Sequence, residues 1–525
     1  MYDLIIKNGQ VIDGSGEKEM FKADVAVEGD KIARIGFLGH LDAKVKIDAH
    51  GMYVMPGFID VLNHSDTYLT LFTSPRQESI VSQGVTTVIG GNCGYSLAPL
   101  VSGNVIDSEE KWTNPSQINI DWLRMSEYLD KLREKKFAVN FGTLTGYNTL
   151  VKGVLKSEYR QPTSQENEIT QFLLEQSLQE GSFGLSLGLA YLYQDRHLTD
   201  HLEDIFEAVA QHDKIVTVHL RDESNQFLDS LSAVLHLAEE KGVKLHISHL
   251  KVIGKQFWPN FRKAVLAIEE ARKKEVQVSY DIFPYASSAT LLYLLLPAWV
   301  KVGGPEMIMR RLKNSFDRKQ VVKDLEAQEL EYDKITVASR APDQVFIGKT
   351  VAGIARNLGV SGAETIVELL LGSLLQVIVF AHVLDEANVQ MGLAHPYALV
   401  ASSGAGYAVE PVRFLSDLPH PRSFGTFPRL FWRYVREKKL LSWEEAVAKV
   451  TSVPARLFGI RNRGLLKEGG FADFAVCDPH AIRDTATFEN PYQYSKGVQH
   501  VIVNGALTFS AGASSGNLPG KVLAA

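Results

Sequence analysis

The 525-residue sequence has only two cysteines, Cys93 and Cys477, and no long uninterrupted apolar run. So few cysteines exclude a secreted scaffold that depends on several disulfides. No apolar stretch reaches the roughly 18 residues that a membrane-spanning helix requires. The first residues also lack the basic region, apolar core and cleavage site of an export signal. We therefore expect a cytoplasmic protein with reduced thiols and no membrane partner.

Blocks of like charge and low-complexity segments are absent as well. Charged residues make up 22% of the chain and hydrophobic residues 45%, which are ordinary values for a globular protein. The formal net charge is −6, and acidic and basic residues are well mixed, so no basic patch indicates a nucleic-acid partner. We expect a small-molecule substrate, and the composition leaves the oligomeric state open.

Short alternating strands separated by turn residues occupy both ends of the chain. Residues 1–55 contain several of them, with turns such as Asn8-Gly9 between the strands. Residues 463–525 show the same pattern. We predict that the two ends pair into one β-sandwich, whose first half is 1–55 and whose second half is 463–525.

Between these ends, apolar strands alternate regularly with amphipathic helices. Residues 56–289 hold the first part of this series, and 346–462 hold the last part together with the C-terminal helices. Polar residues stand at the ends of several strands, which is typical of the C-terminal mouth of a TIM barrel. The predicted fold class is α/β: a TIM-type (β/α)8 barrel with a flanking β-sandwich. A doubly wound sheet is the alternative, but no Gly-rich phosphate loop accompanies these strands.

Residues 290–345 interrupt the alternation with a Leu-rich run, Gly303-Gly304 and charged helical stretches. We predict a small subdomain inserted there between barrel strands. The barrel pattern is expected to resume with strands at 376–382 and 398–404.

Four side chains that can bind a metal stand at predicted strand ends: His64, Cys93, His219 and His249. The last two are one strand–helix unit apart (249 − 219 = 30), so we expect them to be neighbours around the barrel mouth. Zinc prefers thiolate and imidazole ligands, and catalytic zinc usually has three protein ligands plus a water. A single buried Cys or His is more often a core residue, but the four together favour a metal site.

Other polar residues follow the same strands. Arg221 and Lys251 are either solvated loop charges or groups that hold a substrate carboxylate. Tyr191 also follows a strand, where core packing is its ordinary role. His246 has the opposite parity to His249 along one strand, so we predict that it faces the helices and is structural.

These residues lie in a collinear set of motifs that resembles a known family. The set begins with residues 2–14 and ends with residues 518–523. It is similar to the amidohydrolase superfamily, and within it to the N-acyl-D-amino-acid deacylase (D-aminoacylase) family. The motifs between the two ends include Pro56-Gly57-Phe58-Ile59-Asp60, Gly91-Asn92-Cys93-Gly94, Gly184-Leu185-Ser186-Leu187-Gly188-Leu189, His219-Leu220-Arg221-Asp222-Glu223, Ile247-Ser248-His249-Leu250-Lys251 and the run from His420-Pro421-Arg422 to Arg429.

The resemblance implies a zinc-dependent enzyme that hydrolyses an N-acyl-D-amino acid to a carboxylate and a free amino acid. It implies a tightly bound zinc on Cys93, His219 and His249, with Lys251 and Tyr191 near the substrate. The preference for the D isomer comes from the resemblance alone. The implied fold is a TIM barrel with a β-sandwich and a small inserted domain.

The substrate-binding run differs somewhat from the family pattern. The family often has Tyr-Pro-Tyr with a following Gly-Ser, and this chain has Phe283-Pro284-Tyr285 with Ser287-Ser288. The resemblance therefore makes Tyr285 and Ser288 candidate substrate-binding residues, together with Arg221.

Two departures affect the chemistry directly. The first position of the family's His-x-His pair is Leu62, and the family's strand-end acid/base Asp is replaced by Ser403. Leucine cannot bind a metal, and a serine hydroxyl cannot replace a carboxylate as general base, a loss worth about 10²- to 10⁴-fold in rate. A zinc-bound water with a pKa of roughly 7 would remain as nucleophile. The predicted catalytic residues are His64, Asp66 and Ser403: the positions of His64 and Asp66 allow them to carry the proton instead, and Ser403 occupies the family's acid/base position.

Two other hypotheses remain open. In the first, the chain is a degenerate relative that binds metal and ligand without hydrolysis. In the second, the same scaffold carries out another metal-assisted reaction, such as opening of a cyclic amide, elimination or isomerisation.

Overall fold

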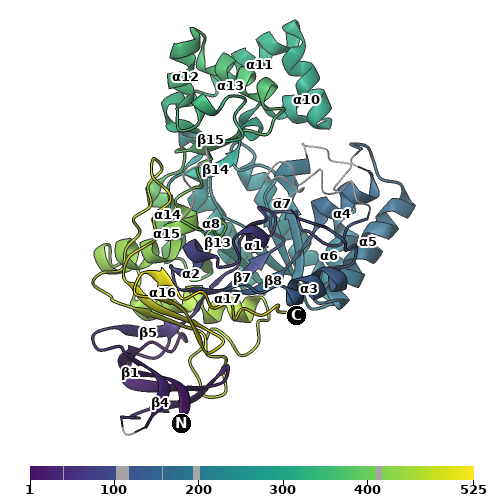
Figure 1. Cartoon of the computed structure of the whole chain (residues 1–525). Coiled ribbons are helices and arrows are strands. Elements are labelled where there is room, and N and C mark those ends of the chain that lie inside the picture. Colours follow the sequence, from purple (N-terminus) through teal and green to yellow (C-terminus); the bar gives the residue numbers. More distant parts are fainter. Residues whose placement is uncertain (40, 102–117, 157, 193–200, 410–416) are drawn as a thin grey trace.

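The computed structural model describes residues 1–39, 41–101, 118–156, 158–192, 201–409 and 417–525 (Figure 1). In this part of the chain, eight parallel strands form a barrel. Each is a short, buried run, as expected where side chains pack on both faces of a strand. The strands are β6 (Phe58–Asp60), β7 (Val85–Gly90), β8 (Asn140–Thr143), β10 (Gly184–Gly188), β11 (Ile215–His219), β12 (Lys244–Ile247), β13 (Val278–Ile282) and β17 (Ala398–Val400).

Hydrogen bonds join these strands in two arcs. β6, β7 and β8 form one arc, and β10, β11, β12, β13 and β17 form the other. The short strand β9 (Thr145–Gly146) follows β8 and pairs with β10, so it connects the arcs on one side. On the other side, a parallel bridge between Asn63 and Gly404 links the ends of β6 and β17. The predicted TIM-type barrel is therefore confirmed.

Helices surround the barrel, and several begin with side-chain caps that satisfy their free N–H groups. In α5 the Thr163 hydroxyl accepts a hydrogen bond from the Glu166 N–H, and the Glu166 carboxylate accepts one from the Thr163 N–H. The helices outside the inserted unit are α1 (Thr70–Thr73), α2 (Glu78–Val81), α3 (Met125–Glu134), α4 (Tyr147–Val154), α5 (Ser164–Gln179), α6 (Leu202–Gln211), α7 (Phe227–Lys241), α8 (Asn260–Lys273), α14 (Glu386–Ala394), α15 (Arg422–Arg429), α16 (Trp443–Val450) and α17 (Ser452–Leu457).

The barrel interior is filled by an apolar cluster. Ile59, Ile215 and Leu399 come from three different strands and belong to one buried cluster, which they can share only inside the barrel. Phe458 joins this cluster from the segment after α17 and fills the end of the barrel at which the strands begin. Leu62 is also a member and is 1% exposed. Its side chain is therefore part of the core.

Both ends of the chain form one nine-stranded sheet. β5 pairs antiparallel with β18, and β1 pairs with β2 on one edge and with β4 and then β5 on the other. The predicted sheet domain built from both termini is confirmed. The sheet branches at β1, because β4 pairs with the first part of β1 and β5 pairs with its last two residues. Its strands are β1 (Tyr2–Val11), β2 (Phe21–Glu28), β3 (Lys31–Gly36), β4 (Ala43–Asp48), β5 (Tyr53–Pro56), β18 (Phe474–Cys477), β19 (Val498–Val503), β20 (Ala506–Ser510) and β21 (Ala513–Ser514).

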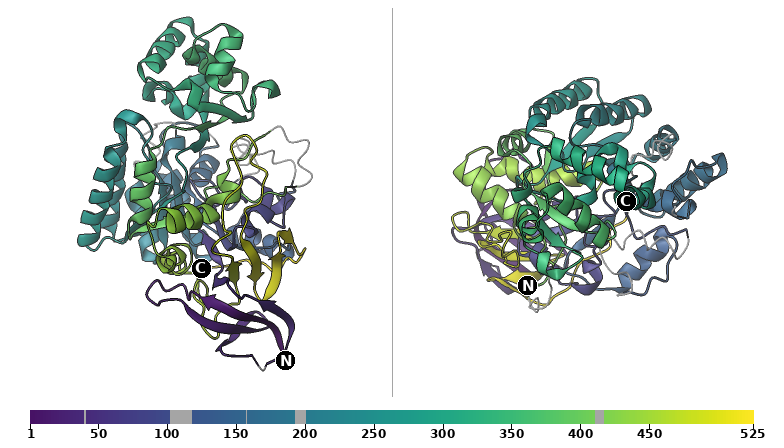
Figure 2. Two further views of the ribbon diagram at one scale, coloured as in Figure 1. Left: turned by 90° about the vertical axis from the view of Figure 1, so that its left-hand side faces the viewer. Right: turned by 90° about the horizontal axis from the view of Figure 1, so that it is seen from above.

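A separate unit is inserted between β13 and β17. Figure 2 shows it in green at the opposite end of the barrel from the terminal sheet. It has its own buried apolar cluster and its own antiparallel sheet in the order β14-β16-β15. Its elements are β14 (Ser288–Leu291), α9 (Ala298–Lys301), α10 (Gly304–Lys313), α11 (Ser315–Ala327), β15 (Ile335–Ser339), α12 (Val351–Leu358), α13 (Gly362–Gly372) and β16 (Ile378–Ala381).

The inserted unit corrects one prediction. Residues 376–382 were expected to form a barrel strand, but β16 is the central strand of the small antiparallel sheet. An apolar run of this length is equally compatible with either sheet, because hydrophobicity does not specify the partner strand. The inserted unit thus continues beyond residue 345, to the end of β16. In the described residues, no helix is long and apolar enough to cross a membrane.

Candidate metal centre and its cavity

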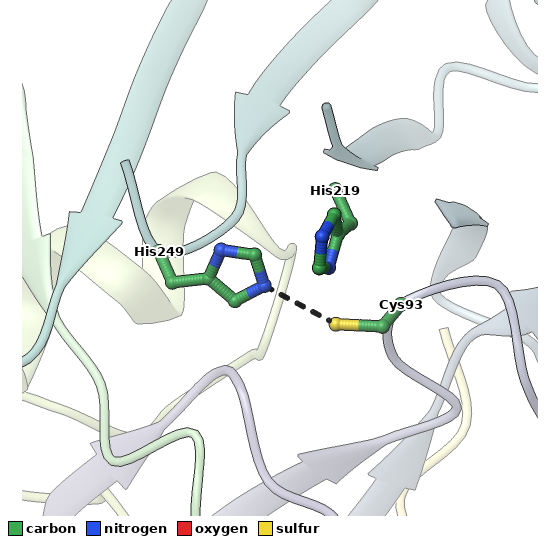
Figure 3. A group of neighbouring side chains, drawn as sticks. All are labelled: Cys93, His219 and His249. Carbon is green, nitrogen blue, oxygen red and sulfur yellow. Dashed lines mark hydrogen bonds between the residues drawn. The ribbon is translucent and has the colours of Figure 1, made fainter. Parts of the chain in front are cut away.

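Cys93, His219 and His249 converge at the mouth of the barrel, from the segment after β7 and the ends of β11 and β12 (Figure 3). Their ligand atoms all lie within 4.8 Å of one another, and Cys93 Sγ is 3.5 Å from His249 Nε2. All three side chains are buried. Both ring nitrogens of His219 lack a hydrogen-bond partner among the described residues. Since unpaired buried polar atoms are costly, this set of one sulfur and two nitrogen donors fits a zinc ion.

The protonation states of these side chains agree with a metal site. Burial lowers the pKa of His219 and His249 well below the usual value, so both imidazoles are neutral and can act as ligands. Burial also raises the pKa of the Cys93 thiol to about 12 in the metal-free protein. Binding a cation must therefore displace this proton, and the metal affinity should rise with pH.

Several residues of the candidate site have left-handed backbone conformations, which set the direction of their side chains. The φ angles of Cys93, His249 and Ser403 are +55°, +37° and +48°, which is unusual for residues with a Cβ. Such conformations cost free energy and concentrate at functional sites. The turn around Cys93 also requires glycine at position 91. A Cβ there would lie 2.1 Å from the Leu144 carbonyl oxygen, which is too close for any side chain.

The position of His246 differs from its prediction. In the register of β11 and β12 it lies beside Thr217, which has the same parity as His219, so it faces the barrel interior. There its Nε2 is 2.9 Å from Asp281 Oδ2. His249 also reaches the barrel mouth because β12 ends at Ile247, and strand parity does not apply beyond that residue. Strand alternation therefore does not extend to His249, and the prediction that His246 faces the helices is wrong.

Glu223 lies beside the candidate metal ligands and had no predicted role. Its Oε1 accepts a hydrogen bond from Lys251 Nζ and is 3.3 Å from His249 Nδ1. Its Oε2 is 3.8 Å from His219 Nε2. Lys251 Nζ is in turn 3.0 Å from His249 Nδ1. The sequence feature that could have identified Glu223 is its position four residues after His219, in the loop that follows β11.

The three candidate ligands line a cavity of about 560 Å³, a volume that includes its open mouth. Five other predicted site residues line it too: His64, Tyr191, Lys251, Ser288 and Ser403. The remaining lining residues are Thr67, Tyr68, Asn92, Tyr95, Glu223, Phe283, Ala289, Thr290 and Arg422.

Three predicted site residues are absent from this lining. Asp66 is buried beneath the cavity, where its Oδ2 accepts a hydrogen bond of 2.6 Å from the Gly91 N–H and so supports the turn that carries Cys93. Burial raises the pKa of Asp66 to about 6. Tyr285 directs its hydroxyl to Asp484 Oδ2, 3.4 Å away. Arg221 is partly buried in the loop after β11.

Arg422 is a second residue that the sequence analysis gave no role. It is the first residue of α15, it lines the cavity and it is 7% exposed. Its guanidinium carbon is 5.0 Å from the centre of the Phe283 ring, and its Nε has no hydrogen-bond partner within the described ranges. A buried guanidinium without a carboxylate indicates a site for an anionic group. The His420-Pro421-Arg422 motif was the signal for it.

His64 and Ser403 lie at the ends of neighbouring strands. The Ser403 N–H donates to the Leu62 carbonyl at 2.9 Å, and the His64 N–H donates to the Gly404 carbonyl at 2.8 Å. Burial, with a smaller contribution from the Arg422 charge, lowers the pKa of His64 to about 3. His64 is therefore a neutral imidazole at the cavity wall.

Comparison with known proteins gives a consistent result. The chain matches the Amidohydrolase family over residues 46–303 and 380–509. It is 32% identical to a D-aminoacylase of Alcaligenes xylosoxydans xylosoxydans, over 100% of this chain and 98% of that protein.

Two solved structures are similar over their full length. One is an N-acyl-D-glutamate deacylase from Bordetella bronchiseptica in complex with zinc and a phosphonate inhibitor that mimics the tetrahedral intermediate. It is 30% identical, covers 100% of both chains and has a TM-score of 0.83. The other is a D-aminoacylase with a binuclear metal centre, described as activated by one metal and attenuated by a second, again 30% identical over 100% of both chains with a TM-score of 0.84.

Proposed function

Because the chain belongs to the amidohydrolase family, we propose that it is a zinc-dependent hydrolase that cleaves N-acyl-D-amino acids into a carboxylate and a free amino acid. The observation that carries this proposal is the single cavity that combines the Cys93, His219 and His249 set with Arg422, whose Nε has no partner among the described residues. One part of the cavity suits a metal and the other suits a carboxylate. The D preference rests on the activities of the similar deacylases.

Cys93, His219 and His249 would hold the zinc ion. A zinc ion bound there supplies Lewis acidity, which polarises an acyl carbonyl and lowers the pKa of water to roughly 7. Glu223 lies against both histidines and would keep their rings oriented for coordination. A reducing compartment such as the cytoplasm would keep the Cys93 thiol available, and neither cysteine is in a disulfide.

The other cavity residues would bind and orient the substrate. Arg422 would bind the α-carboxylate with two parallel hydrogen bonds, and Phe283 would support the plane of the guanidinium. Lys251 is held by Glu223 at the same wall. Burial raises the pKa of Tyr191 well above its usual range, so its hydroxyl stays protonated. Its ring packs against His219 with centroids 4.8 Å apart, which supports a role for the phenol beside the reacting carbonyl.

The decisive experiment measures amine release from a panel of N-acetyl-D-amino acids, N-acetyl-L-amino acids and cyclic amides by the zinc-loaded protein. We expect hydrolysis of the N-acetyl-D-amino acids. Cys93→Ala should abolish both stoichiometric zinc and hydrolysis, whereas Cys477→Ala removes a buried thiol far from the cavity and should retain zinc. Zinc binding without hydrolysis of any N-acyl amino acid would reject the proposal.

A protein that binds metal and ligand without turnover is the second candidate. The observation in its favour is Ser403, which places a hydroxyl at the cavity wall where the resemblance leads us to expect a carboxylate. Saturable binding of N-acyl amino acids without any amine release would support this candidate.

A further inference from the structure

The cavity offers few groups that can accept a proton. Among its described lining residues, Glu223 is the only carboxylate, and the imidazoles are those of His64, His219 and His249. Glu223 is already bound to Lys251 and lies against the two histidines that would coordinate the metal. His64 is the remaining base.

We propose that His64 is the catalytic proton carrier of this chain and takes over the work of the missing strand-end carboxylate. This inference rests on the proposed function, since it assigns a step of amide hydrolysis. Ser403 is too weak a base for the role, and Asp66 does not line the cavity and accepts a hydrogen bond from the Gly91 N–H.

The geometry supports His64 in three ways. First, its side chain is partly exposed and lines the same cavity as the candidate metal ligands. Second, its backbone is fixed by the hydrogen bond to Gly404, so the ring starts from a rigid strand end. Third, its ring nitrogens make no hydrogen bond to any described residue, and its recorded ring neighbour is Tyr68, with centroids 6.0 Å apart.

The charges around His64 indicate when it becomes a better base. The groups around it are Arg422 of α15, Tyr68 on its own segment, and the candidate ligands His219 and His249. Burial disfavours the imidazolium form of His64 most, and the Arg422 charge adds a smaller contribution. A substrate carboxylate bound to Arg422 would offset this smaller contribution and so increase the basicity of His64.

The proton balance of the reaction is complete with one imidazole. The water oxygen forms a bond to the acyl carbon while a water proton moves to a ring nitrogen of His64. The carbon–nitrogen bond then breaks, and His64 returns this proton to the departing amine nitrogen. The products are the carboxylic acid and the free amine, and His64 is neutral again.

The test compares His64→Gln and His64→Ala with the wild-type protein. We expect kcat to fall by about 10²- to 10⁴-fold, with KM, zinc content and calorimetric affinity for an N-acetyl amino acid near the wild-type values. Added imidazole should restore turnover of His64→Ala in proportion to its concentration, which a purely structural histidine would not allow. Ser403→Asp should also restore turnover in the His64→Ala background, since Asp tolerates the left-handed backbone of residue 403.

His236→Gln is the matched control, because it removes a histidine whose side chain is 76% exposed on α7. A kcat within about threefold of wild type in both His64 variants would overturn the proposal. A loss of kcat that neither imidazole nor Ser403→Asp reverses would overturn it too, since the role of His64 would then be structural. Absence of hydrolysis in the wild-type protein would instead reject the proposed function. If one variant fails to fold, the other carries the same comparison.

Discussion

Arg422→Met separates substrate binding from stability, because we expect it to change the two in opposite directions. Arg422 is 7% exposed, lines the cavity and has an Nε without a partner in the described part of the chain. Burial also lowers its pKa, so the charged form is held at a cost. Methionine fills a similar length with apolar atoms and carries no charge.

The expected gain in stability follows from two opposing contributions. An unsatisfied buried polar atom costs about 1–3 kcal/mol. The contact of the guanidinium with the Phe283 ring stabilises the wild-type protein by about 0.5–2 kcal/mol, and the variant loses it. The ligand-free variant should therefore be more stable by roughly 1 kcal/mol. The entropy of unfolding is about 2.1 cal/mol/K per residue. For a chain of 525 residues, each kcal/mol of added stability therefore raises Tm by about 1 °C.

The expected loss in binding is larger. A charge-assisted hydrogen bond is worth about 1.5–3 kcal/mol, so losing a bidentate pair costs about 3–6 kcal/mol and should raise KM by about 10²- to 10⁴-fold. Amine release at varied substrate concentration measures this change, and calorimetric scanning without ligand measures the Tm. Arg422→Lys keeps the charge but cannot bind a carboxylate in the same forked geometry, and it should recover only part of the affinity.

Arg429→Met provides the contrast from the same helix. Arg429 pairs with Asp484 at 3.0 Å, so its removal takes the ion-pair partner from a buried carboxylate, leaves it only neutral donors such as the Tyr285 hydroxyl, and should lower Tm. If Arg422→Met lowered Tm and left KM unchanged, Arg422 would be a structural arginine, and its assignment to the substrate carboxylate would be refuted.

Three further predictions concern the metal and the turn beneath it. Glu223→Gln should weaken zinc binding by about 10- to 100-fold in a chelator competition, whereas Glu240→Gln on the surface of α7 should not; equal affinities would mean that Glu223 does not orient the ligands. A tenfold excess of zinc should load a single equivalent, because Leu62 is in the barrel core and Ser403 lacks a carboxylate; a second tightly bound equivalent by mass spectrometry would contradict this. Asp66 has its pKa raised from 3.8 to about 6, so its favourable contribution to folding is complete below pH 4 and is lost as the pH rises through about 6. This upward shift of the Asp66 pKa corresponds to about 3 kcal/mol of folding free energy. Asp66→Asn should therefore reduce the loss of stability between pH 4 and 6 in denaturant titrations. An unchanged pH dependence would show that another group causes the loss.

The barrel and the three candidate metal ligands could be located from the sequence. Short apolar runs that end in Cys93, His219 and His249 could be located from the alternation of strands and helices, and barrel topology brings such ends together. Arg422 could not be located in this way, because it comes from a helix 173 residues after His249 (422 − 249 = 173). No local pattern predicts which distant helix will cover the mouth of a barrel.

The incorrect predictions come from the ends of strands and from strand pairing. His246 was assigned by parity from His249, but β12 stops before His249 and the alternation does not extend to it. The catalytic role predicted for Asp66 stays a prediction; its side chain accepts a hydrogen bond from the Gly91 N–H and does not line the cavity. β16 was assigned to the barrel because an apolar strand carries no information about its partner.

The terminal sheet imposes an order of events during synthesis. β5 leads directly into the first barrel strand, but its antiparallel partner β18 begins 418 residues after β5 ends (474 − 56 = 418). At about 5–20 residues per second, translation leaves β5 without this partner for roughly 20–80 seconds. One edge of the N-terminal strands is therefore open to chaperones and to other chains throughout that interval. The strands β18 to β21, which leave the ribosome after the barrel, complete the same sheet that β1 to β5 began.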